Sequence, residues 1–435
     1  LQETSWHRDI SRWARGDVAG ELDQAKNVFD WTVRNIQLEA DRPGRVPQLP
    51  WETLYFGRGT ATERAWVCIL LLRQLQIDAA MLAVESDATE RGLGTSVPGQ
   101  SGEPKLRPWC VGVLIEDEVY LFDPALGLPI PAADGVTRTA DGRLAVEPAT
   151  LAEVAAHPKL LERLDVDSSR KYGFDAAALK RVVTLLEASP DYLSQRMKLL
   201  ELSWKPAQPS QGLVLTTSPT EQATRWRAAK PSVSVRLWLQ PFETLDRRMR
   251  LDRRTALARL AMMVPYCWMH EDRITIRNRD SEDPNPAAEQ RTIRAPALGQ
   301  ARVLYLKNKF AGDRGAIHYY QMARPSDQRV MASSISNQEK SILLSGKQDA
   351  TYGLGLIAYD NGNYDAAIDY FTSRSQPPLI SPESAWADGA RYNLARAYEA
   401  SGERQRAVLV YRSNVTAPDR YGQLLRAKWL SELKK

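Results

Sequence analysis

The sequence predicts an α+β fold, because three kinds of pattern follow one another along the chain. Apolar residues recur at helical spacing in the first 80 residues, and runs typical of strands follow between residues 80 and 122. The C-terminal part repeats one pattern at an offset of forty residues. We therefore expect three domains: a mixed helix-and-strand domain over residues 1–165, an α/β domain over residues 174–345, and an all-α helical-repeat module over residues 346–435.

Composition sets wide limits on the class of protein. At 435 residues the chain is long enough for two or three domains, and 43% hydrophobic with 26% charged residues excludes wholesale disorder. The net charge of +5 suits an acidic polymer or an anionic surface and requires neither. The basic run over residues 247–254 has no interleaved aromatic residue, and the chain lacks a phosphate-binding glycine motif. We therefore expect no nucleic-acid partner.

Membrane and metal signals are weak. No apolar run approaches the roughly eighteen residues of a membrane span. The sequence begins at Leu1 rather than Met, so an unseen N-terminal segment stays open as a route to export or to membrane association. The three cysteines and four histidines show no metal-ligand spacing, and we expect neither a metal nor another cofactor. Cys68 and Cys110 lie in apolar runs and are interpreted as core thiols, with a disulfide between them left open.

The first elements are helices, expected over residues 2–15, 21–36 and from residue 61 onward. In the third helix Thr60 is a good N-cap and Glu63 completes a capping box, which makes Ala61 the first helical residue. The apolar residues of this helix recur at helical spacing and predict one buried stripe, formed by Ala65, Cys68, Ile69, Leu72 and Leu75.

Strands are expected next, over residues 80–84, 109–115 and 119–122, with a polar loop over residues 86–104 and a tight acidic turn at residues 116–118. A hairpin-like region with two Asp-Gly turn signals leads to helices over residues 150–164. Residues 165–173 have little apolar content, and we expect a linker between domains there.

The helix from Ala61 and the strands after it resemble the core of the transglutaminase-like (papain-type) fold, over roughly residues 20–130. The ending Leu71-Leu-Arg73-Gln-Leu-Gln-Ile-Asp-Ala79 carries most of the resemblance. The resemblance implies a Cys-His-Asp triad, whose positions are held here by Ala61, Arg107 and Asp123. Arg107-Pro-Trp109 keeps only the tryptophan of the family's His-x-Trp, and Asp123-Pro124 retains the aspartate.

This degenerate triad predicts a pseudoenzyme. A thiol enzyme needs a thiolate and a base to accept its proton, but Ala61 has no nucleophilic atom and arginine stays protonated. Independently of the alignment, no histidine lies between His7 and His157. Two positions for Arg107 stay open: an ion pair with Asp123 or exposure to solvent. The disabled cleft could also bind a peptide or glycan through Trp109, Arg58 and Arg64, although core packing explains a tryptophan equally well.

The middle domain resembles no family that we identify. A capping box at Ser218 predicts a helix to about residue 229. Further helices are expected around residues 176–187 and 191–204. Strands are expected over residues 213–216, 232–239, 273–277 and 302–306, and a long polar loop over residues 278–297. An alternative function is a hydrolase whose site in this domain has His270 or His318 at its wall.

The C-terminal module has an internal repeat. Gly355, Gly362, Ala367 and Phe371 are echoed at the same offsets by Ala395, Gly402, Ala407 and Tyr411. These positions resemble tetratricopeptide repeats, in which the small residues let paired helices approach and the aromatic residue fills the space between them. A last helix over residues 419–433 is expected to cap the stack.

Together these features predict a non-catalytic scaffold or assembly protein that binds protein partners, or a second copy of itself, through the helical repeats. In bacteria this combination of domains is associated with the cell envelope. The resemblance therefore implies an exported, periplasmic or envelope location, and a cytoplasmic location stays open.

Overall fold

The structure is a computed structural model that describes residues 1–86, 105–139, 142–204, 212–230, 232–263, 269–276, 289–332, 336–372 and 385–433. Its contacts divide the chain into two compact units, the first formed by Leu1–Arg250 with Arg391–Lys435 and the second by Leu251–Ala390. Each unit is described by itself. The three domains expected from the sequence stay a prediction. The fold is mixed, with helices predominating and an all-helical C-terminal region, in agreement with the predicted α+β class.

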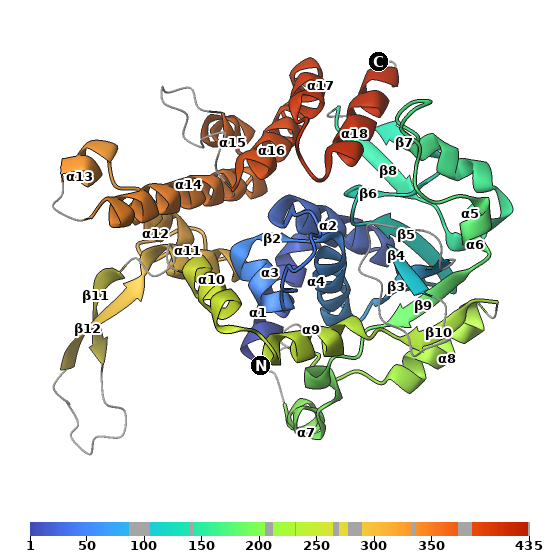
Figure 1. The fold of residues 1–435 in the computed structure, drawn as a ribbon, viewed down its shortest axis with the longest axis horizontal. Coiled ribbons are helices and arrows are strands. Elements are labelled where there is room, and N and C mark those ends of the chain that lie inside the picture. The colour runs from blue at the N-terminus through green and yellow to red at the C-terminus, as the bar shows by residue number, and fades with distance from the viewer. Residues whose placement is uncertain are drawn as a thin grey trace. The chain divides into compact units, whose positions relative to one another are not determined.

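A six-stranded sheet organises the first unit (Figure 1). Its strand order is β10-β9-β3-β4-β5-β6, and every neighbouring pair is antiparallel except β10 with β9. The strands are β3 (Asp78–Ser86), β4 (Lys105–Ile115), β5 (Glu118–Asp123), β6 (Leu128–Pro129), β9 (Val182–Leu186) and β10 (Ser234–Leu237). The predicted acidic turn joins β4 to β5, and Glu116 and Asp117 both have positive φ, as a two-residue type I′ hairpin requires.

Helix α4 (Ala61–Gln74) lies at the centre of this unit. It contacts β3 and β4, and it also contacts α1 (Gln2–Ala14), α2 (Glu21–Asn35) and α3 (Pro50–Phe56). Its predicted start is confirmed, because the Thr60 side chain accepts from the Glu63 N–H and the Glu63 carboxylate accepts from the Thr60 N–H. The predicted apolar stripe is buried except at Leu75, which is half-buried. Burial extends beyond the stripe: every residue from Glu63 to Arg73 is buried, since neighbours cover the helix all round.

The next predicted elements also form. β7 (Pro131–Arg138) and β8 (Leu144–Pro148) are an antiparallel pair, followed by α5 (Leu151–Ala156) and the 3₁₀-helix η1 (Pro158–Leu164). The two-residue strands β1 (Gln37–Leu38) and β2 (Arg58–Gly59) pair in parallel ahead of α4. Most of the loop expected over residues 86–104 lies outside the described residues.

The helix expected around residues 176–187 is wrong. Only α6 (Ala176–Leu179) is helical, and β9 follows it. Every residue of Val182-Val-Thr-Leu-Leu186 is buried, because β9 lies between β3 and β10 within the sheet. A short apolar run rich in β-branched residues is typical of a strand covered on both faces, and periodicity alone does not distinguish it from a buried helix.

The strand expected over residues 213–216 is also wrong. This segment pairs with no strand, because side chains satisfy its backbone: the N–H groups of Leu215 and Thr216 donate to Glu201 at 2.7 and 2.8 Å. The helix predicted from Ser218 is confirmed as α8 (Pro219–Ala229). The remaining helices of this region are η2 (Pro190–Leu193), α7 (Gln195–Ser203) and α9 (Gln240–Met249).

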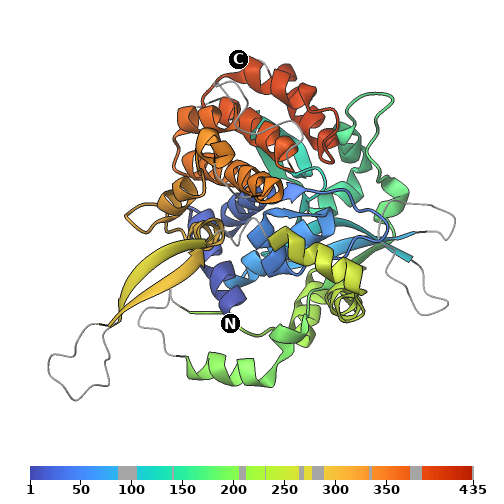
Figure 2. The same cartoon turned by 60° about the vertical axis from the view of Figure 1, so that its left-hand side comes forward.

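The second unit contains a two-stranded antiparallel ribbon, β11 (Met269–Ile276) and β12 (Glu289–Pro296), seen in Figure 2. Part of the predicted polar loop is therefore a strand, and residues 277–288 lie outside the described residues. Residues 302–306, expected as a strand, belong to α11 (Ala297–Leu306), whose Ala297, Ala301 and Tyr305 form a buried row at helical spacing. The other helices are α10 (Arg253–Met263), α12 (Ala316–Met322), α13 (Asp327–Ala332), α14 (Asn337–Asp360) and α15 (Tyr364–Phe371).

Both copies of the predicted C-terminal repeat are helical pairs. In the first copy, α14 packs on α15, and a Cβ atom at Gly355 would lie 2.5 Å from the Phe371 ring, so only glycine permits this approach. The second copy is α16 (Ala387–Ala400) with α17 (Arg404–Ser413), where Ala395, Ala407 and Tyr411 are fully buried. The predicted last helix is α18 (Arg420–Glu432). Within the described residues, no helix combines the length and apolar character that crossing a bilayer requires.

Candidate functional site

The three positions of the triad that the resemblance implies lie on one helix and two strands. Ala61 is the first residue of α4, Arg107 is on β4, and Asp123 ends β5. Ala61 offers only a methyl group at the positive end of the helix. Of the two ionisable side chains, Arg107 is half-buried and Asp123 is buried, with 2% of its surface exposed.

Three groups of the chain donate hydrogen bonds to Asp123. Its Oδ1 accepts from the backbone N–H groups of Ala125 and Leu126 at 2.8 and 3.0 Å, and its Oδ2 accepts from the Tyr172 hydroxyl at 2.6 Å. Burial raises the pKa of Asp123, although these hydrogen bonds and Arg64 act in the opposite direction. Both oxygens of the Asp123 carboxylate therefore accept hydrogen bonds from groups of the protein itself.

Tyr172 and Phe174 cover the site. The Trp109 Nε1–H donates to the Tyr172 oxygen at 2.8 Å, and the Phe174 ring lies 5.6 Å from the Trp109 ring. The Arg107 guanidinium lies 3.8 Å from the centre of the Phe174 ring and donates to the Gly173 carbonyl. Of the two positions left open for Arg107, the ion pair with Asp123 does not form among the described residues. The half-buried Arg107 stacks on Phe174, and the Tyr172 hydroxyl donates to the aspartate instead.

Sequence reasoning assigned residues 165–173 to a linker and missed Tyr172. We name residues 165–174 the strap. Helix α18 holds it, because the Tyr421 hydroxyl donates to the carbonyls of Leu164 and Arg170 at 2.9 and 3.0 Å, and Lys428 Nζ donates to the Asp165 carbonyl at 2.8 Å. The only local signal was a pair of aromatic residues in an otherwise polar segment.

The three candidate binding residues have different surroundings. Arg64 is buried, and its guanidinium donates to the carbonyls of Ile36 and Pro124. Trp109 is 3% exposed beneath the strap. Arg58 is half-buried, 3.9 Å from a Glu39 oxygen. Two of the three side chains therefore serve internal contacts and do not line an open cleft.

The cysteine interpretation as core thiols is confirmed for the two cysteines in the described residues. Cys68 and Cys110 are buried and free, so they form no disulfide. Burial raises the pKa of the Cys68 thiol to about 12 and that of Cys110 well above its usual value, so neither is a thiolate near neutral pH. Cys267 lies outside the described residues.

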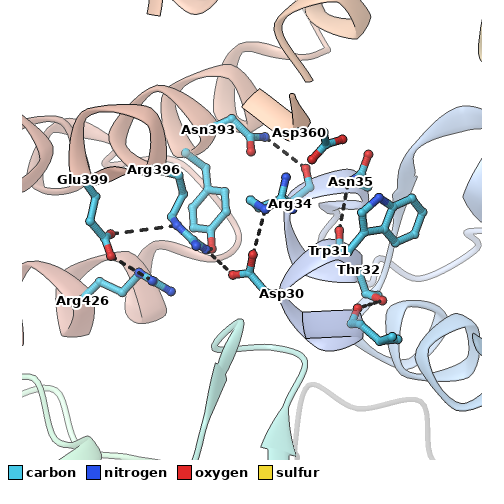
Figure 3. Close-up of polar contacts among 12 residues, drawn as sticks. Asp30, Trp31, Thr32, Arg34, Asn35, Asp360, Asn393, Arg396, Glu399 and Arg426 are labelled. Carbon is cyan, nitrogen blue, oxygen red and sulfur yellow. Dashed lines mark hydrogen bonds and ion pairs between the residues drawn. The ribbon is translucent and has the colours of Figure 1, made fainter. Parts of the chain in front are cut away.

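The second repeat pair is docked on α2 by a buried polar network (Figure 3). The Asn393 side chain donates to the Arg34 carbonyl at 3.1 Å, and Arg396 Nη1 donates to Asp30 at 2.7 Å. Arg34 Nε donates to the same carboxylate at 2.9 Å. Although burial would raise the pKa of Asp30, Arg396 and Arg34 outweigh it and hold that pKa below its usual range. One face of α16 is thus committed to the chain's own N-terminal helices.

Glu399 is the centre of the network within the repeat. Its carboxylate accepts from the Leu144 N–H and from the Tyr411 hydroxyl, each at 2.9 Å, and lies 3.4 Å from Arg426 Nη2. It therefore ties α16 to β8, α17 and α18 at once. Burial alone would raise the pKa of Glu399, but Arg426 and Arg396 lower it.

Residues of α17 line a groove together with residues of β7 and α18. A groove of about 880 Å³ lies between Arg138 at the end of β7, the first turns of α17, and Ser431 of α18. We name it the α17 groove; its lining residues are Arg138, Gly402, Glu403, Arg404, Gln405, Arg406, Val408, Leu409 and Ser431.

A second cavity, of about 350 Å³, lies in the first unit between α1, α4, α9 and the segment around Tyr192. Glu3 lines it, and burial together with the nearby Asp191 raises the pKa of Glu3 to about 7. No histidine lines this cavity. His270 is on β11 and His318 on α12 of the second unit, where His318 packs against Tyr319. Within the described residues no group of histidine, cysteine or acidic side chains could hold a metal ion.

Comparison with known families adds one finding. A family model described as tetratricopeptide repeat matches residues 390–420. The second helical pair therefore matches a tetratricopeptide repeat. The match spans α16 and α17 and contains most of the α17 groove lining. The comparison with curated proteins finds no match, and the comparison with solved structures finds none. The transglutaminase-like resemblance therefore rests on the residues quoted for it, and a tetratricopeptide repeat suggests protein–protein interaction.

Proposed function

We propose that this protein is a non-catalytic scaffold or assembly protein that binds a protein partner through its tetratricopeptide repeat. The repeat match at residues 390–420 carries the proposal, since such helical pairs present side chains for partner proteins. The docking of α16 on α2 supports it further, because a repeat fixed by a buried network presents its free surface in one orientation.

The surroundings of the degenerate triad support the non-catalytic part of the proposal. Ala61 supplies no nucleophile, and Arg107 is packed against Phe174. Asp123 is engaged by Tyr172, so it orients no base. Acyl transfer by a thiol mechanism needs all three roles filled.

The mass of the full chain in solution tests the interaction. Light scattering after size-exclusion chromatography is measured for the protein alone and after incubation with an extract of its source cells, and copurifying chains are identified by mass spectrometry. We expect either a stable self-assembly or one reproducible partner. A strictly monomeric protein that retains no partner would contradict the proposal.

The cell-envelope location is proposed on the resemblance alone. Fractionation of source cells followed by immunodetection tests it. We expect the protein with the envelope or periplasmic fractions, and recovery in the cytoplasmic fraction alone would contradict this part.

A further inference from the structure

The α17 groove differs from the rest of the repeat surface in charge. Three guanidinium groups line it, those of Arg138, Arg404 and Arg406, against the single carboxylate of Glu403. Arg406 pairs with Glu403 at 2.6 Å, which leaves two positive charges in excess. Because Coulomb attraction in a partly desolvated groove is stronger than in open water, this excess favours a negatively charged occupant.

Two features of the groove are suited to a carboxylate. The Arg138 side chain lines the groove and forms no ion pair among the described residues. Helix α17 has ten residues, and its first turn has no side-chain cap, so the positive end of the helix faces the groove. A carboxylate beside both would be attracted by the guanidinium charge and by the positive end of the helix.

An apolar contact lies one helical turn further along. Leu409 is 65% exposed, which is high for a leucine within a packed repeat, and Val408 beside it also lines the groove. Gln405 and Leu409 are four residues apart, so they share a face of α17 with an axial separation of about 6 Å. Residues i and i+2 of an extended peptide are about 6.7 Å apart and point to the same side.

We propose that the α17 groove binds an extended acidic segment of a partner protein, with a side-chain carboxylate at Arg138 and the start of α17, and an apolar side chain two residues later against Leu409. The inference rests on the proposed function and deepens it, because it names the surface and the chemistry of the partner. The face of α16 that meets α2 is used within the chain, whereas the α17 groove is lined by other residues of the repeat.

The test uses the full chain and a fluorescein-labelled ten-residue peptide that contains Glu-Glu-Ser-Leu, with fluorescence anisotropy as the readout. We expect saturable binding that weakens with salt, and at least tenfold weaker binding when each Glu of the peptide is replaced by Gln. Arg138→Glu and Leu409→Asp should each weaken binding at least tenfold.

Matched controls exclude a general charge effect. Arg227→Glu makes the same charge change at an exposed residue of α8. Leu199→Asp replaces a leucine of α7 that is 67% exposed. Both should bind the peptide as the unchanged protein does. The thermal midpoint of every variant is measured first, so that only folded proteins are compared.

Three outcomes overturn the inference. Equal binding by Arg138→Glu, Leu409→Asp and the controls would place the peptide elsewhere. Binding of phosphatidylglycerol vesicles without binding of the peptide would identify a lipid surface instead. A native partner that copurifies equally well with Arg138→Glu and Leu409→Asp would reject the groove as the binding surface and leave the proposed function intact. A full chain that retains no partner and stays monomeric would reject the proposed function itself.

Discussion

Asp123 and Glu399 are both almost fully buried carboxyl groups, yet their pKa values move in opposite directions. Burial is the largest influence on each and raises both. At Asp123 the hydroxyl and amide donors only partly oppose burial, so the pKa stays raised. At Glu399 the charges of Arg426 and Arg396 outweigh burial, so the pKa is lowered. The two residues therefore give opposite dependences of stability on pH.

Replacing Tyr172 with phenylalanine tests the first case. Loss of a hydrogen bond to a charged group should reduce the free energy of unfolding at neutral pH by roughly 1.5–3 kcal/mol. Because the folded-state pKa of Asp123 is raised, stability is greatest below its ordinary value of about 3.9 and falls as pH rises through the raised pKa. Tyr172→Phe removes a group that lowers this pKa, so the fall should extend to higher pH. Urea denaturation across pH measures both effects.

Tyr120→Phe is the control for that variant. Tyr120 lies on the same strand as Asp123, and its hydroxyl makes no hydrogen bond among the described residues. We expect a change within about 0.5 kcal/mol. A Tyr172→Phe variant as stable as this control would show that the hydroxyl bond to Asp123 is not formed.

Glu399→Gln tests the second case. It leaves Arg426 buried without its counter-charge, whereas Arg396 keeps Asp30, so docking of α16 and α18 should weaken by about 3–5 kcal/mol. Hydrogen exchange of the α16 amides measures this locally. Glu403→Gln, which breaks a more exposed pair with Arg406, should cost no more than about 1 kcal/mol.

The same variant has a predicted pH signature. Because the folded-state pKa of Glu399 is lowered, its contribution is complete above the ordinary glutamate value of about 4.3 and is lost as pH falls through the lowered pKa. Amide protection of α16 should therefore decrease in acid in the unchanged protein. Equal acid sensitivity in Glu399→Gln would contradict this assignment.

At the scale of elements, α18 connects the repeat to the covered triad. Gly422 of α18 packs against the turn after β5, where an added Cβ would overlap the carbonyl oxygen of Leu126. Asp123 organises that same turn through the N–H groups of Ala125 and Leu126. Together with the Tyr421 contacts to the strap, this makes α18 the element that closes the site.

Gly422→Ala should displace α18. Glycine to alanine within a helix normally stabilises it by roughly 1 kcal/mol, but here the overlap should destabilise the docking by roughly 1–3 kcal/mol. Faster hydrogen exchange in both α18 and the strap is the expected result. Gly173→Ala, where an added Cβ would meet no atom within 4 Å, should leave both unchanged. Faster exchange in α18 alone would mean that the helix does not hold the strap.

At the scale of the whole molecule, the proposed non-catalytic role requires the strap to keep covering Asp123. Introducing the two missing triad residues by Ala61→Cys with Arg107→His should therefore yield no transamidation or peptide hydrolysis. The reason is that Tyr172, a residue of the strap, still donates its hydrogen bond to Asp123. An amine-incorporation assay and a peptidase assay measure this, and a thiol titration confirms the new cysteine. Turnover by the unchanged protein would contradict the non-catalytic proposal directly.

Local chemistry made some features readable from the sequence. Thr60 and Glu63 exchange hydrogen bonds within three residues, so the start of α4 needs no tertiary information. The same holds for the helix after Ser218 and for the acidic turn at Glu116 and Asp117. The repeat offsets, including Gly355 against Phe371, were also readable, because each repeat is a local helical pair.

Tertiary structure decided the rest. Val182–Leu186 is a strand because β3 and β10 supply the missing hydrogen bonds, and no short apolar run contains that information. Burial of Arg64 depends on carbonyls from Ile36 and Pro124, which lie far along the chain on either side. Ala61 and Arg107 could be read from the sequence at two positions of the triad that the resemblance implies. The hydrogen bond from Tyr172 to Asp123 could not be read, because it requires a segment 49 residues beyond Asp123 to fold back over it. Contacts of that separation depend on the whole fold, since nothing local fixes which residues meet.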